Sequence, residues 1–305
     1  MATLYLWVLG PTTAGILAAG VWWVVRGRKS AAPARGVRWT ALAAGLLVVL
    51  GVVVARLSGA SALLPFDVPA GVFTVLWENR FSVPLVIGVV GVALLVLPVR
   101  RRGGRGTADL TRRSLVSFAR PRWFVAPGVL LLVLLVITLA TGAASEPDPT
   151  TGRYTAYTVE LGGERSMGTT IYGWYYSVPA LVVLGVLVAV MLLGMHLVAR
   201  PPLAQDRAAD VAARVATTRA IVVGVTGTLL AHLGLVFASV SATSSVRSMF
   251  RTSEGPVWFW TPFSALEPLT TAASILCAAL GVALWTSIAL SALPSSRRSP
   301  VAVAA

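Results

Sequence analysis

Histidine, cysteine and acidic side chains are the groups here that could do chemistry, and the chain has few of them. It contains two histidines, one cysteine and 11 acidic residues among 305 positions. His232, Thr228 and Glu267 lie in or beside apolar stretches and form a candidate intramembrane polar site. Ionisable residues inside a membrane usually mark transport pathways or proton relays. His232 could instead be a structural group bonded to Thr228 or Ser239, or a ligand to haem or metal.

A haem held by both histidines is not expected. His196 lies near one end of its apolar stretch, and its depth differs from that of His232 by roughly 15 Å at the rise of an α-helix. The sequence has no P-loop, H-E-x-x-H or C-x-x-C motif. We therefore expect no catalytic residues, no cofactor and no metal, a colourless purified protein and a non-enzymatic role.

A second group combines arginine with aromatic residues. Arg247 and Arg251 are four positions apart, so they would share a face on a helical turn. They could pair with Glu254 or Glu160, or with an anionic ligand. The aromatic rings could alternatively anchor their loops in the lipid headgroups. The candidate surface for a ligand or partner comprises Arg247, Arg251, Glu254, Trp258, Trp260 and Trp174.

A third candidate lies in the arginine-rich segment Thr107–Arg122. A short helix there would place Phe118 beside Arg112 and Arg113, and such a helix lies at a membrane interface. It could also dock a cytoplasmic partner, such as an ATPase subunit. The alternative is that these arginines set the topology and attract anionic lipids of the cytoplasmic leaflet.

The amino-acid composition indicates that membrane-spanning helices position these candidate groups. Hydrophobic residues make up 56% of the chain and charged residues 12%, and the mean hydropathy is +0.81. Soluble domains usually carry about 25% charged residues, so we predict a single all-α polytopic membrane domain over 1–305. A crossing helix needs roughly 20 apolar residues. Seven stretches qualify, at 4–25, 39–57, 81–99, 123–143, 177–199, 220–240 and 266–290.

Loops at one end of this seven-helix bundle are expected to form a small cap. The loops on that side are 58–80, 144–176 and 241–265, and they are rich in aromatic residues. Within the second, alternating apolar and polar residues around a Gly-Gly pair predict a β-hairpin in 153–172. The broken apolar segment 61–73 is too short to cross and is interpreted as re-entrant or interfacial.

The distribution of basic residues predicts the orientation. Of the 25 basic residues, 19 fall in 26–38, 100–122, 200–219 and the tail after 290, and 6 fall on the other side. Basic loops face the cytoplasm, so we predict a plasma-membrane protein with its N-terminus outside and its C-terminus in the cytoplasm. The basic character then reflects topology, and nucleic acid is not an expected partner. No cleaved signal peptide is expected, and the preference for arginine over lysine suggests a bacterial source.

Small residues recur at spacings of three and four in the sixth stretch. They are Gly224, Gly227, Ala231, Gly234 and Ala238. Small residues on one face let two helix backbones approach closely within lipid. The stripe therefore predicts a helix-packing face, used either inside one chain or as a homodimer seam.

Three functions fit these features. The composition resembles that of the permease components of ABC exporters, which combine apolar spans with basic cytoplasmic coupling helices. Such permeases usually have an even number of spans and both termini inside. This resemblance implies a non-enzymatic membrane subunit of a transport or export complex, acting with an ATPase or another membrane subunit. The alternatives are an extracytoplasmic sensor or assembly factor that binds through aromatic outer loops, and a redox protein linked to haem or quinone.

Overall fold

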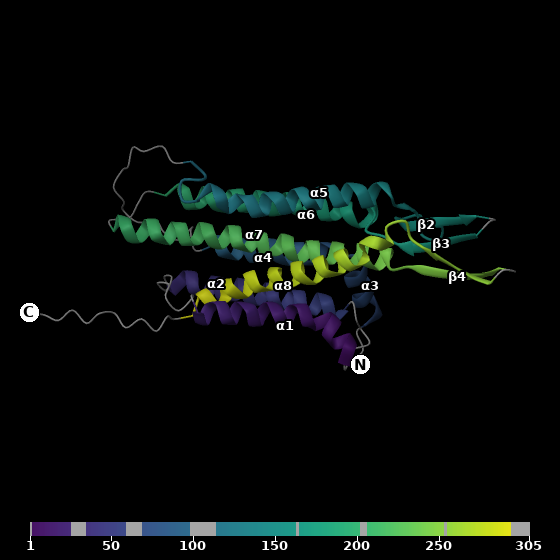
Figure 1. Ribbon diagram of the computed structural model, residues 1–305. Coiled ribbons are helices and arrows are strands. Elements are labelled where there is room, and N and C mark those ends of the chain that lie inside the picture. Colours follow the sequence, from purple (N-terminus) through teal and green to yellow (C-terminus); the bar gives the residue numbers. More distant parts are fainter. Residues whose placement is uncertain are drawn as a thin grey trace, which may run out of the picture.

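The computed structural model is a long helical bundle with strands at one end (Figure 1). It describes residues 2–25, 35–58, 69–97, 114–162, 165–201, 206–252 and 255–293. Within these ranges, six helices are long and apolar enough to cross a membrane. They are α1 (Ala2–Val25), α2 (Arg35–Ser58), α5 (Val125–Ala143), α6 (Trp174–Ala199), α7 (Arg207–Ser244) and α8 (Glu267–Ser291). The chain is therefore a multi-pass helical membrane protein, as the sequence predicts.

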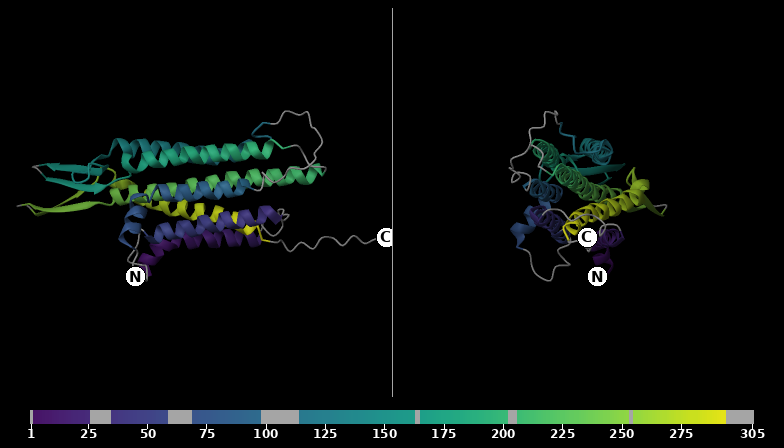
Figure 2. Two further views of the ribbon diagram at one scale, coloured as in Figure 1. Left: turned by 180° about the vertical axis from the view of Figure 1, so that it is seen from behind. Right: turned by 90° about the vertical axis from the view of Figure 1, so that its left-hand side faces the viewer.

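The remaining predicted span, 81–99, corresponds to a bent pair of helices. α3 (Ala70–Glu78) and α4 (Ser82–Val96) meet at 82° and give a seventh span if they are counted as one. α4 has 15 residues and is about 22 Å long, which is shorter than a typical hydrocarbon core. α3 has no buried residue and lies across the bundle end (Figure 2). It therefore fits an interfacial helix and includes the last part of the predicted segment 61–73, whose residues 61–68 lie outside the described ranges.

α7 is the central helix of the bundle. It contacts α4, α5, α6 and α8. Of the residues in its apolar stretch, 72% are buried, compared with 22–33% of the residues in the apolar stretches of the other five long helices. α7 has 38 residues and is about 57 Å long, much longer than the hydrocarbon core. It begins at Arg207 and therefore starts 13 residues before the predicted span 220–240.

The small-residue stripe of α7 lies mostly against α8. The Ser274 hydroxyl donates a hydrogen bond of 2.7 Å to the Gly234 carbonyl. A Cβ on Gly281 would come within 2.8 Å of the Ala231 nitrogen and the Gly227 oxygen. Trp285 packs beside Gly224 and Gly227, whereas Ala238 is exposed. The two backbones touch within one chain.

Replacing Gly234 with leucine should destabilise this contact. A Cβ there would lie 3.0 Å from the Ala278 nitrogen and 3.1 Å from the Ser274 oxygen. Overpacking of this kind typically costs about 1–3 kcal/mol. Thermal melting in detergent should therefore shift down for Gly234→Leu but not for Gly185→Leu, because a Cβ on Gly185 of α6 would meet no described atom within 4 Å. Equal melting of both variants would show that the α7–α8 contact is not tight.

The strands form two separate antiparallel sheets beyond the helices. β2 (Tyr154–Gly162) pairs with β3 (Arg165–Thr170), with the short β1 (Glu146–Pro147) on its edge. The hairpin predicted in 153–172 is thus confirmed. A second hairpin, β4 (Arg247–Thr252) and β5 (Gly255–Trp260), lies in the predicted loop 241–265, where no strands were predicted. This end is called the strand end, and the N-terminus lies there (Figure 1).

The opposite end of the bundle is called the basic end. α8 ends there (Figure 1). Several arginines lie at or beside the described helix termini of this end. The antiparallel helices bring together segments that are far apart in the sequence. The arginines at this end include Arg38, Arg120, Arg122, Arg200 and Arg207.

Candidate functional site

The β4–β5 hairpin gathers the predicted arginine and tryptophan residues on one face. Directly opposite residues of an antiparallel pair share a face, and so do alternate residues of one strand. The register pairs Arg247 with Trp260, Met249 with Trp258, and Arg251 with Pro256. The segment is a strand and not the predicted helical turn, but a spacing of four keeps both arginines on the same face in either case. This surface, here called the hairpin face, comprises Arg247, Met249, Arg251, Trp258 and Trp260.

The hairpin face is open to its surroundings. Met249 is 45% exposed, Trp258 51% and Trp260 52%. Arg247 pairs with Glu267 at the start of α8 at 3.4 Å and not with Glu160. Glu254 lies outside the described residues, so a pairing with it stays a prediction. Arg251 is exposed and forms no ion pair with a described residue, so its charge is not offset by any carboxylate in the described part of the chain.

The residue pairs of the hairpin face lie at different distances from the helices. Both strands continue the direction of α7 and α8 away from the bundle (Figure 1). The pair Met249–Trp258 therefore lies about 7 Å further from the helices than the pair Arg247–Trp260. This separation is comparable to the thickness of a headgroup layer, about 5–8 Å.

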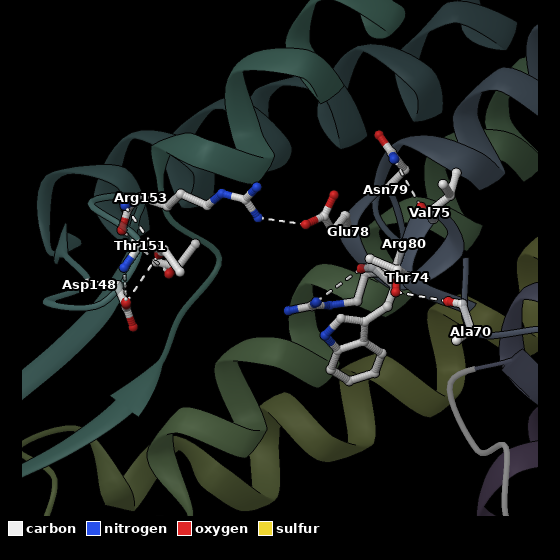
Figure 3. A network of polar contacts seen from close by, with 11 residues as sticks. Ala70, Thr74, Val75, Glu78, Asn79, Arg80, Asp148, Thr151 and Arg153 are labelled. Atoms are coloured by element: carbon white, nitrogen blue, oxygen red, sulfur yellow. Dashed lines mark hydrogen bonds and ion pairs between the residues drawn. The ribbon is translucent and has the colours of Figure 1, made fainter. Parts of the chain in front are cut away.

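A second cluster at the strand end surrounds Arg80, in the turn between α3 and α4. Its guanidinium lies 4.4 Å from the Trp77 ring centroid and 4.3 Å from that of Tyr176, within cation–π range. It also donates a hydrogen bond of 3.1 Å to the Trp77 carbonyl (Figure 3). Arg80 thereby joins the α3–α4 bend to the start of α6.

Arg153 makes a parallel link from the loop before β2. It pairs with Glu78 at 2.7 Å (Figure 3), and its guanidinium lies 4.5 Å from the Tyr175 ring centroid. The hydrogen bond to Glu78 raises the pKa of Arg153. In the same loop, hydrogen bonds from Thr150 and Thr151 lower the pKa of Asp148 to about 2. The link from Arg153 holds the first sheet against α3.

Trp174 belongs to the packing of the bundle and not to the hairpin face. It begins α6, and its ring lies against Gly142 of α5, where a Cβ would come within 2.6 Å. The sequence groups it with Trp258 and Trp260 only because all three are predicted on the same side of the membrane. Of the five predicted surface residues that the structure describes, four therefore lie on one hairpin.

His232 is completely buried in α7. Its Nδ1 donates a hydrogen bond of 3.0 Å to the Phe81 carbonyl, and its ring lies edge-on to Tyr172 with centroids 6.1 Å apart. This bond corrects the expected pairing with Thr228 or Ser239. Nε2 has no hydrogen-bond partner among the described residues.

The three residues of the predicted intramembrane site have different partners. Thr228 donates to the Gly224 carbonyl and accepts from Trp285 Nε1, while Glu267 pairs with Arg247. His196 is exposed on α6, away from the buried position of His232. Over the described ranges, no group of three His, Cys, Asp or Glu residues could hold a metal ion.

The described part of the predicted docking helix at 107–122 is not one continuous helix. Arg112 and Arg113 lie outside the described residues. Residues 115–118 form a turn, and Pro121–Phe124 form a short 3-10 helix, because Pro121 favours the first position of a helical turn over its interior. Phe118 faces inward, with its ring centroid 5.3 Å from the guanidinium of Arg214.

Arg214 forms an extensively bonded polar contact at the basic end. It pairs with Asp210 one turn earlier in α7, with 2.8 Å between Nη2 and Oδ2. Its Nη1 also donates to the carbonyls of Val198 at 2.9 Å and Pro201 at 2.8 Å. The side chains of Arg214 and Asp210 are 5% and 8% exposed. Arg214 therefore fastens the end of α6 to α7.

Comparison with known proteins gives no relative for this chain: no protein-family model, curated protein or solved structure matches it. Fold and site geometry together define the class as a multi-pass helical membrane protein with a two-hairpin cap at one end.

Proposed function

We propose that this protein recognises a partner protein outside the cytoplasm through the hairpin face. The observation that carries the proposal is one exposed surface that combines Met249, Trp258 and Trp260 with Arg251, whose charge no described residue neutralises. Tryptophan and arginine are the residues most often responsible for binding energy at protein interfaces. A partner with apolar groups flanked by carboxylates complements this surface. The role is that of a non-enzymatic sensor or assembly factor.

The interior gives little support to a secondary-transport pathway through the described spans. Secondary transporters place charged groups and broken helices near the middle of the membrane. In the described spans, Asp and Glu occur only near helix ends, at Asp206, Asp210 and Glu267. The contact between α7 and α8 is filled by Trp285, which is 1% exposed. These helices favour a static scaffold that carries the cap.

The orientation of the scaffold is part of the proposal. The arginine-bearing helix termini lie at the basic end, and basic segments face the cytoplasm. The strand end then faces outward, and the protein lies in the plasma membrane with its N-terminus outside. The hairpin face is accordingly available to proteins of the cell surface or periplasm.

Cysteine labelling in intact cells tests this exposure. In a Cys277→Ser background, Met249→Cys on the hairpin face should react with a membrane-impermeant maleimide. Ala216→Cys, at an exposed position of α7 near the basic end, should react only after permeabilisation. Labelling of Ala216→Cys but not Met249→Cys in intact cells would reverse the orientation and overturn recognition outside the cytoplasm.

A further inference from the structure

A single arginine lines a cleft within the membrane-spanning bundle. Arg56 lies in the last turn of α2, two residues before this helix ends at Ser58. The cleft lies between α2, α4, α7 and α8, and its other lining residues are apolar: Val52, Ala55, Pro84, Ala231, Leu235 and Ala278. Arg56 is half-buried there, so one positive charge faces an otherwise apolar space.

Arg56 has no counter-ion among the described residues. Its Nη1 donates one hydrogen bond, 3.3 Å long, to the Val8 carbonyl of α1. Two carboxylates of the strand end form ion pairs with other arginines: Glu78 pairs with Arg153, and Glu267 pairs with Arg247. A guanidinium has five N–H donors, and within the described ranges one of those on Arg56 is bonded, to Val8. A charge in this position is costly unless it is paired or reaches the membrane surface.

The position of Arg56 suits a lipid phosphate. Two residues of helix correspond to about 3 Å, so the long side chain can reach the headgroup level at the strand end. The planar guanidinium matches the oxygens of a phosphate group with two parallel hydrogen bonds. A neighbouring acyl chain would lie along Ala55 and Leu235, the half-buried apolar residues of the lining.

We propose that the cleft binds an anionic phospholipid of the strand-end leaflet, with its phosphodiester on Arg56 and an acyl chain against the apolar lining. Phosphatidylglycerol has this chemistry and carries no ammonium group to compete with the guanidinium. This site is separate from the hairpin face, and its occupancy does not depend on the proposed partner.

Lipid retention by the purified full-length protein tests the site. Wild-type protein in detergent should keep phosphatidylglycerol through size exclusion and melt at a higher temperature when that lipid is added. Arg56→Gln should retain about tenfold less, the loss expected for one charge-assisted contact. Arg251→Gln is the matched control, because it removes the same charge from the exposed hairpin and should retain lipid normally.

A second variant keeps the test decisive if Arg56→Gln does not fold. Ala55→Phe retains the arginine but fills the cleft, and it should also lose the lipid. Phosphatidylcholine and inorganic phosphate should give smaller stabilisation than phosphatidylglycerol. The proposal is overturned if Arg56→Gln or Ala55→Phe retains as much lipid as Arg251→Gln. It is also overturned if phosphate alone or phosphatidylcholine stabilises equally, because the site would then select neither a lipid nor its charge.

Discussion

Replacing Arg214 with glutamine is expected to lower the free energy of unfolding by about 3–5 kcal/mol, the usual cost of removing one partner of a buried ion pair. The substitution leaves Asp210 buried without its cation. It also frees the carbonyls of Val198 and Pro201, which now accept hydrogen bonds from Arg214. The end of α6 should consequently separate from α7.

Thermal melting and denaturation by a harsh detergent measure this effect. Arg219→Gln is the matched control, because Arg219 is about one turn further along the same helix and exposed. Surface charges contribute little to stability, so Arg219→Gln should melt like wild type. If the two variants were equally stable, Arg214 would not fasten α6 to α7.

The helices could be predicted because each depends on its own sequence. A run of about 20 apolar residues in lipid must bond its backbone internally and becomes a helix. Six predicted spans therefore match helices that are long and apolar enough to cross. The bend between α3 and α4 is not apparent in the sequence, because hydropathy alone does not show that two apolar helices meet at an angle.

The sequence contains a turn motif that predicts the β4–β5 hairpin. A helical interpretation of this segment does not take that motif into account. The residues Ser253-Glu254-Gly255-Pro256 favour a turn between two apolar strands, and Gly255 has φ +128°, a conformation that glycine adopts readily. The spacing of Arg247 and Arg251 fits a helical turn equally well. Their common face is still predicted correctly, because four residues are an even number of steps along a strand.

The remaining contacts of the site depend on tertiary structure. Glu78 and Arg153 are 75 positions apart, and no spacing rule connects them. The pair Asp210 and Arg214 has helical spacing that the sequence does display. Its burial, however, results from α6 ending beside α7, which cannot be inferred from either helix alone.

Truncating both tryptophans of the hairpin face is expected to abolish partner binding. Interface residues of this type contribute about 2 kcal/mol or more each, so each loss weakens binding about 30-fold. Trp258→Ala with Trp260→Ala should leave insertion and melting unchanged, because both rings are about half exposed. Val257→Ala is the control, since Val257 is an exposed neighbour on the opposite face of β5.

Complementation of a strain that lacks the gene tests recognition through the hairpin face most directly. The variants to compare are Trp258→Ala/Trp260→Ala at the strand end and Arg120→Ala/Arg122→Ala at exposed positions of the basic end. With equal amounts in the membrane, the tryptophan pair should fail to restore the wild-type phenotype, and the arginine pair should restore it. Restoration by the tryptophan pair and failure of the arginine pair would contradict the account and assign the function to the basic end.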